Sequence, residues 1–205
     1  MAIAAGTMLA ATAAFPALAQ PSPERSVVRS PRAACLAAVR AAERAHGIPE
    51  GLLVAIALNE SGLHAFALNI GGRSHYPATR EEARRLYWEA LGREPVMAGC
   101  VQVNAGVHAR RSDWPLDPFV AADWGARYLR RHYERTGDWA DALVRWHGGS
   151  PENAARLVCR VRGRMDVTAP GHAVFEGFRC GGDTAVARLR RDGRALLELA
   201  EAAER

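Results

Sequence analysis

The sequence lacks the residue patterns that commonly bind metal ions or nucleic acids. It contains no Cys-x-x-Cys and no His-Glu-x-x-His spacing, so we expect neither a metal site nor a cofactor. Lysine is absent, and the basic residues are arginines spread along the chain, without a basic block. Because no aromatic-plus-basic pattern accompanies them, we expect no nucleic-acid partner. The net charge of +5 favours another acidic partner, such as anionic lipid or an anionic cell-wall polymer.

Charge is also absent from residues 2–20, which are rich in alanine. This run contains the small-x-small site Ala17-Leu-Ala19, which is typical of signal-peptide cleavage. We therefore expect a secretory signal peptide over residues 1–19 and a mature protein in the periplasm or cell envelope. A membrane anchor is the alternative, but the run is short for a membrane span and is interrupted by Pro16.

Cysteine is scarce, with four residues in the whole chain. An even number in an exported protein predicts two disulfides, and free buried thiols are the alternative. Three pairings are open, and the sequence does not choose among them. We weakly favour Cys35–Cys159, which would tie the first helix to the last helix of the core. The four positions are Cys35, Cys100, Cys159 and Cys180.

The 205 residues are enough for one domain with extensions. Apolar spacing and helix-capping residues predict a mainly α fold with short connections. Gly71-Gly72 indicates at most a small β-hairpin. We expect an exposed linker over 20–32, a helical domain over 33–165, and a loop with a C-terminal helix over 166–205. The expected helices are 33–46, one that contains Glu60, one opened by the capping box at 79–82, 118–135, 139–146, 151–161 and 184–204.

Glu60 is the one ionisable residue in the most apolar run of the mature chain, residues 51–63. Pro49 suits a first helical position and Gly62 a position just past a helix end, so we expect Glu60 in the last turn of a buried helix. The negative end of the helix dipole and the loss of water both favour the neutral carboxyl group. A carboxylic acid that stays protonated near neutral pH can act as a proton donor. The alternative is a solvated, purely structural glutamate.

Three short motifs follow one another with predicted helices between them: Glu60-Ser61, Gly99-Cys-Val-Gln102-Val-Asn104 and Trp146-His147-Gly-Gly. Together they resemble the soluble lytic transglycosylase (SLT) domain, a family with a goose-type-lysozyme-like fold that cleaves bacterial peptidoglycan. The resemblance covers about residues 33–165 in order and spacing. It implies a lysozyme-like helical domain and glycan strands of peptidoglycan as the binding partner of a monomeric protein.

The resemblance implies a reaction that needs only one carboxyl group. Glu60 would protonate the oxygen between N-acetylmuramic acid and N-acetylglucosamine, and would then take the proton of the sugar's 6-hydroxyl, giving a 1,6-anhydro end. The nearby acids Asp113, Asp117 and Asp123 are expected in loops or caps, which agrees with a single catalytic carboxyl group. The resemblance implies substrate contacts by Ser61, Gly99, Gln102, Asn104, Trp146 and His147, and we add Tyr76 as a cleft candidate.

Each of these binding residues has a structural alternative. Ser61 would be a helix-end hydroxyl, Gly99 a turn residue, and Gln102 and Asn104 backbone caps. Trp146 would be a core residue and His147 a surface residue. The chain also departs from the family. Trp146-His147 stands where an aromatic-His or Tyr-Asn pair is usual, and Leu157 where a tyrosine is common. Two other functions therefore stay open. One is a hydrolytic muramidase, which would need an aspartate to activate water, and the other is an inactive peptidoglycan-binding component of a secretion or flagellar assembly.

Overall fold

The computed structural model describes residues 30–181 and 183–204. The signal peptide expected over 1–19, and most of the linker expected over 20–32, lie outside these residues. Residues 31 and 32 already belong to the first helix, so the helical part begins earlier than expected. Within the described ranges, no helix combines the length and the apolar character that crossing a membrane requires.

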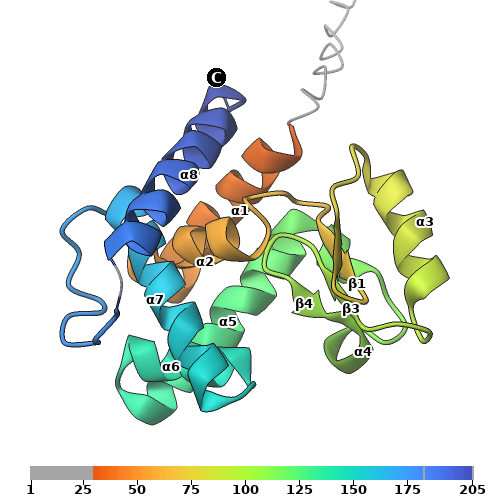
Figure 1. Cartoon of the computed structure of the whole chain (residues 1–205). Coiled ribbons are helices and arrows are strands. Elements are labelled where there is room, and N and C mark those ends of the chain that lie inside the picture. The colour runs from red at the N-terminus through yellow and green to blue at the C-terminus, as the bar shows by residue number, and fades with distance from the viewer. Residues whose placement is uncertain (1–29, 182, 205) are drawn as a thin grey trace, which may run out of the picture.

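Six helices form the larger part of the molecule, which we call the helical lobe. Helix α1 packs on α5, α2 packs on α7, α5 on α6, and α7 on α8. Together they bury one apolar core around α2, whose first seven residues are all buried. Figure 1 shows α1, α2 and α5 at the centre, with α6, α7 and α8 on one side. Their bounds are α1 Pro31–His46, α2 Leu52–Glu60, α5 Pro118–Thr136, α6 Trp139–His147, α7 Pro151–Thr168 and α8 Asp183–Ala202.

The segment between α2 and α5 forms a second part, the sheet lobe, with its own small core. Its antiparallel sheet has the strand order β2-β1-β3-β4, and Leu68 is paired with both His75 and Ala98. The sheet and α3 lie at the opposite side of the molecule from α6 to α8 (Figure 1). Its elements are β1 Leu68–Ile70, β2 Arg73–His75, α3 Arg80–Ala90, β3 Val96–Ala98, β4 Val103–Asn104, α4 Ala105–His108 and the 3-10 turn η1 Trp114–Leu116.

This architecture confirms the mainly α expectation and the hairpin around Gly71-Gly72, but the sheet is larger than a hairpin. Residues 96–104 fold back on themselves and add β3 and β4, because the turn at 99–102 reverses the chain. Gly99 makes this reversal possible, since it adopts a left-handed φ of +77°. A Cβ atom at this position would overlap the carbonyl oxygen of Pro115.

Polar side chains cap the first turns of α3, α5, α6 and α7. Asp117 accepts hydrogen bonds from the backbone N–H groups of Phe119 and Val120, at 3.0 and 3.1 Å. The side chains of Thr79, Asp138 and Ser150 accept a backbone N–H in the same way for α3, α6 and α7. Such caps satisfy donors that a helix start leaves unpaired, typically worth about 1 kcal/mol each.

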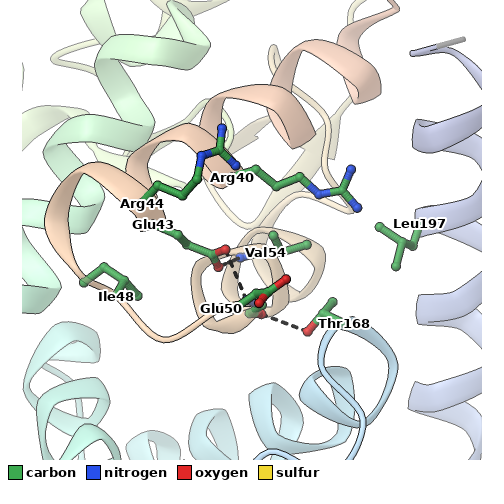
Figure 2. Close-up of a pocket in the computed structure, with 9 residues that line it drawn as sticks. Arg40, Glu43, Arg44, Ile48, Glu50, Val54, Thr168 and Leu197 are labelled. Atoms are coloured by element: carbon green, nitrogen blue, oxygen red, sulfur yellow. Dashed lines mark hydrogen bonds between the residues drawn. The ribbon is translucent and has the colours of Figure 1, made fainter.

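Helix α2 begins later than expected, at Leu52 rather than near Pro49. Gly51 precedes it with a left-handed φ of +79°, and no side chain at this position caps the helix. Instead, the buried carboxylate of Glu43 on α1 accepts the N–H groups of Gly51, Leu53 and Val54 at 2.7–3.1 Å. Figure 2 shows Glu43 reaching across to Val54. The helix that carries Glu60 is therefore anchored at its start by a neighbouring helix.

Two disulfides form, Cys35–Cys100 and Cys159–Cys180. The expectation of two bridges is confirmed, but the favoured pairing of Cys35 with Cys159 was wrong. Cys35 faces the turn that joins β3 to β4, and its Cα atom lies 5.7 Å from that of Cys100. Cys159, on α7, is bridged instead to Cys180 in the loop before α8. The first bridge therefore links the helical lobe to the sheet lobe.

Candidate active site

A cleft of about 560 Å³ lies between the sheet lobe and the helical lobe. Both lobes contribute polar and aromatic side chains to its lining, which suits a ligand that carries hydroxyl and amide groups on an apolar ring. The sheet lobe and the turn at 99–102 contribute Asn69, Met97, Val101, Gln102, Val103, Asn104, Val107 and His108, and the helical lobe contributes Glu60, Trp124, Tyr128, Trp146, His147 and Leu157.

Glu60 is the last residue of α2, as the sequence predicts, and its side chain lines the cleft. The chain leaves the helix immediately through Gly62, whose φ is +61°. Burial raises the pKa of Glu60 above its ordinary value, while a hydrogen bond from Asn59 and the charge of Arg160 oppose this rise. Desolvation is the largest of the three effects, so the site favours a protonated carboxyl group.

Glu60 is the only carboxyl group that lines the cleft, as far as the described residues show. The three aspartates considered from the sequence are engaged elsewhere. Asp113 pairs with Arg84, Asp117 caps α5, and Asp123 pairs with His46 and Arg127. A two-carboxylate mechanism would need a second acid on the opposite face of the same cleft. In the described residues, the lining therefore supplies one carboxyl group for proton transfer.

Gln102 lies in the turn at 99–102 and lines the cleft. Its backbone has a φ of +49°, which is uncommon for a residue with a side chain. The amide Nε2 donates to the carbonyl oxygens of Gly99 at 2.9 Å and Ala67 at 3.1 Å. These two bonds fix the side chain and leave its amide oxygen as a hydrogen-bond acceptor. Gly99 itself is not among the lining residues and acts on the cleft by shaping the turn.

Asn104 lines the cleft and also caps α4, where its Oδ1 accepts the N–H of Val107 at 3.3 Å. Ser61, in contrast, is buried and does not line the cleft. Its hydroxyl oxygen lies 2.8 Å from the carbonyl oxygen of Cys100 and 3.1 Å from that of Ala57, and the single hydroxyl proton is shared between these two acceptors. Tyr76 is 59% exposed and lies beside the ring of His64, outside the cleft.

Aromatic rings form the wall of the cleft on the helical side. Trp124 and Tyr128, one turn apart on α5, are stacked with ring centroids 5.0 Å apart. From the sheet lobe, the ring of His108 lies against this wall, with its centroid 4.9 Å from that of Trp124. Burial lowers the pKa of this histidine. Trp146 lies 5.8 Å from Tyr128 and packs over Gly125, where a Cβ atom would come within 3.2 Å of its ring. Trp146 therefore contributes both to the cleft and to the packing of α6 on α5.

His147 and Leu157 complete the lining next to Trp146. His147 stands at the end of α6, and its Nδ1 accepts the N–H of Gly149 at 3.1 Å. Leu157 is buried, and its hydrocarbon side chain adds no polar group to the neighbourhood of Glu60. The cleft thus brings together Glu60, Gln102, Asn104, Trp146 and His147 from the residues named by sequence, and it leaves out Ser61, Gly99 and Tyr76.

Several cleft residues were missed by the sequence reasoning. Trp124 and Tyr128 carried a usable signal, because aromatic residues four positions apart lie on one face of a helix. Asn69 and Met97 gave no such signal, since they reach the cleft only through strand pairing at register Asn69 with Met97. Asn59 does not line the cleft but donates to Glu60, and it was missed because it lies in an apolar helical run typical of a core.

A second cavity of about 270 Å³ lies at the other end of α2, between α1, α7 and α8 (Figure 2). Its polar groups are largely paired within the protein. The Glu43 carboxylate caps α2, and Thr168 donates to the carbonyl oxygen of Gly51 at 2.8 Å. Arg40 pairs with Glu201 of α8 and with Glu204 just beyond its end. Within the described ranges, no group of three or more His, Cys, Asp or Glu side chains could hold a metal ion.

Comparison with protein families matches residues 37–157 to the family described as "Transglycosylase SLT domain". This match spans more than half of the chain and includes Glu60, the turn at 99–102 and the end of α6. Neither the curated proteins nor the solved structures give a match to the chain. The order of the motifs, the helical fold and the family match agree, and the chain belongs to the transglycosylase SLT domain family of peptidoglycan-acting proteins.

Proposed function

We propose that this protein is a lytic transglycosylase that cleaves the β-1,4 bond between N-acetylmuramic acid and N-acetylglucosamine without water. The observation that carries the proposal is the position of Glu60. It is the one carboxyl group lining the cleft within the described residues, and burial raises its pKa. A carboxyl group that is protonated before the reaction can donate to a leaving oxygen.

The reaction begins with a protonated Glu60. The carboxyl group donates its proton to the glycosidic oxygen, and the bond between that oxygen and the anomeric carbon breaks. The substrate's own acetamido group stabilises the resulting positive charge, which makes a second carboxylate unnecessary. Glu60, now ionised, takes the proton of the 6-hydroxyl group, whose oxygen bonds to the anomeric carbon. The product is a 1,6-anhydro end, and Glu60 is again protonated.

The other lining residues provide the means to hold a glycan strand. Trp124, Tyr128 and Trp146 present rings on which the apolar faces of sugars can stack. The Nε2 of Gln102 already donates to two backbone carbonyl oxygens. Its amide oxygen is therefore the atom that can bind substrate, by accepting a hydrogen bond from a sugar hydroxyl or an acetamido N–H. His147 and Asn104 line the same cleft and extend the polar contacts.

The two disulfides support a location outside the cytoplasm, since such bonds persist in oxidising compartments. We infer that the protein acts in the periplasm or cell envelope, where its polymeric substrate lies. A contribution to a secretion or flagellar assembly as a wall-opening component is compatible with this location.

Product mass decides the reaction type. Purified peptidoglycan digested by the protein should yield 1,6-anhydro muropeptides, which are lighter by one water than hydrolytic products. Glu60→Gln should lower product release by about 10²–10⁴-fold, the scale for losing a general acid. Reducing-end products would indicate a hydrolytic muramidase instead. Release that is unchanged in Glu60→Gln would exclude the proposed role of Glu60.

One observation favours a second candidate, an inactive peptidoglycan-binding protein. Leu157 lines the cleft where relatives commonly carry a tyrosine, so no hydroxyl group assists Glu60 from this side. Binding of glycan strands without any product, by both the wild type and Glu60→Gln, would support this function over the first.

A further inference from the structure

Two hydrogen bonds connect Glu60 to a cation on another helix. The amide Nδ2 of Asn59 donates to Oε1 of Glu60 at 3.0 Å. The Nε of Arg160 donates to Oδ1 of the same asparagine at 3.1 Å. Asn59 and Glu60 end α2, whereas Arg160 belongs to α7, and the two helices pack on each other. Arg160, Asn59 and Glu60 therefore form a chain of two hydrogen bonds, which we call the relay. It connects the guanidinium group to the carboxyl group in the cleft.

The chemistry of the arginine sets the direction of this relay. A guanidinium group only donates hydrogen bonds, so the asparagine atom that faces Arg160 must be the amide oxygen. The amide nitrogen is then turned toward Glu60 and can only donate. Oε1 of Glu60 must therefore accept this hydrogen bond. In the neutral acid the proton is then carried by the other oxygen, Oε2. Within the described part of the chain, Oε2 has no hydrogen-bond partner.

We propose that Asn59, oriented by Arg160, is a positioning residue that directs the acidic proton of Glu60 to Oε2, the oxygen left free for the substrate. This inference rests on the proposed function, because it concerns the group that transfers the proton. Neither Asn59 nor Arg160 lines the cleft, so both act on the reaction through Glu60.

The relay also serves the second half of the reaction. Glu60 is half-buried, so once it has given up its proton the carboxylate needs compensation for the water it lacks. The Asn59 hydrogen bond and the charge of Arg160 both lower the pKa of Glu60, against the dominant effect of burial. They therefore hold the carboxylate in place until it accepts the proton of the 6-hydroxyl group. One group can serve as acid and then as base only if neither form is too strongly disfavoured.

The experiment combines a titration with kinetics in Asn59→Leu, Arg160→Met and the double variant. The titration follows the ¹³C signal of the Glu60 carboxyl carbon, assigned by its loss in Glu60→Gln, and does not depend on turnover. Arg156→Met is the matched control, since Arg156 lies one turn earlier on α7 and bonds to Asn153 instead. Unfolding midpoints of all variants show whether each one remains folded.

We expect the pKa of Glu60 to rise in Asn59→Leu and in Arg160→Met, and to stay unchanged in Arg156→Met. Because the acid must be protonated, the alkaline limb of kcat/KM should move to higher pH in the first two variants. On soluble glycan strands, kcat should fall about 10-fold while KM is unchanged, which is less than the 10²-fold that a 1 Å misplacement can cost. In kcat the double variant should resemble Asn59→Leu alone, because Arg160 positions the proton of Glu60 through Asn59. The pKa of Glu60 should rise further in the double variant, because the charge of Arg160 also acts on the carboxyl group directly.

A Glu60 titration that is the same in Arg160→Met and in the wild type would overturn the relay. Single effects on kcat that add in the double variant would also overturn it. Failure of the proposed function looks different. In that case the wild type releases no anhydro product, while the titration of Glu60 still reports whether Asn59 and Arg160 control its carboxyl group.

Discussion

The hydroxyl group of Ser61 donates to the carbonyl oxygen of Cys100 at 2.8 Å, and so joins the end of α2 to the turn that carries Gln102. The hydroxyl proton is shared with the carbonyl oxygen of Ala57, and the hydroxyl oxygen accepts the N–H of His64, each at 3.1 Å. Glu60 and Gln102 belong to different lobes of the molecule. Their relative position in the cleft therefore depends on a buried serine next to the proposed acid.

Ser61→Ala should lower the free energy of unfolding by about 1–3 kcal/mol, because it leaves buried backbone groups without a partner. Denaturant unfolding measures this loss, and Ser74→Ala on the exposed part of β2 is the matched control with little expected effect. Glycan affinity should change little, since Ser61 does not line the cleft. A variant with wild-type stability but weakened glycan binding would show that Ser61 contacts the substrate directly.

Removing the two disulfides should have unequal effects on stability. Cys35–Cys100 spans 65 residues and Cys159–Cys180 spans 21. Chain-entropy arguments then give losses of about 4 kcal/mol and about 3 kcal/mol for the respective double Cys→Ala variants. Denaturant unfolding measures both, and turnover should fall only in the Cys35/Cys100 variant, whose bridge holds the turn at 99–102. Equal loss of turnover in the two variants would argue against this special role.

Glu60→Gln should stabilise the protein at neutral pH. The pKa of Glu60 is raised in the folded state above its ordinary value of 4.5, so the ionised form is disfavoured by folding. Below about pH 4.5 both the folded and unfolded states are protonated, and the penalty is absent. As the pH rises through the folded pKa the penalty becomes complete, and the advantage of the glutamine variant grows. Thermal unfolding midpoints of the two proteins across this pH range test the sign.

A midpoint difference that is largest in acid and vanishes at neutral pH would contradict this prediction. Glu89→Gln is the control, because Glu89 is exposed on α3 and does not line the cleft. Its substitution should not reproduce the pH-dependent difference expected for Glu60→Gln.

Trp124→Ala should weaken the binding of glycan strands by about 10-fold, the equivalent of 1.4 kcal/mol for a lost stacking surface. Binding to soluble strands, measured in the Glu60→Gln background to prevent turnover, gives the affinity. Trp88→Ala is the control, since Trp88 is 44% exposed on α3 and does not line the cleft. An equal effect of the two substitutions would mean that Trp124 is not a binding surface.

Local signals in the sequence were sufficient to place the proposed acid. The apolar run before Glu60 and the glycine at 62 define the end of α2, because a left-handed residue terminates a helix. Asp117-Pro118 likewise marks the start of α5. Both features are read from neighbouring residues, and so they need no knowledge of the tertiary structure.

Features that depend on distant contacts could not be read in this way. Helix α7 runs to Thr168, although the sequence predicts its end near Val161. A glycine usually weakens a helix interior, but Gly163 is buried against α8. A Cβ atom at this position would lie 3.5–3.8 Å from the side chains of Val186 and Leu189, so its absence lets α8 pack closely on α7. Cysteine pairing and the two short strands after residue 95 depend on the same kind of contact.

The Cys35–Cys100 disulfide makes the cleft depend on the redox state of the compartment. The turn at 99–102 is covalently linked to α1 only when both thiols have been oxidised. A newly made chain in a reducing compartment would lack this bridge. The proposed cleavage of peptidoglycan would then begin only after the two thiols are oxidised, so the bond that stabilises the fold would also delay the activity.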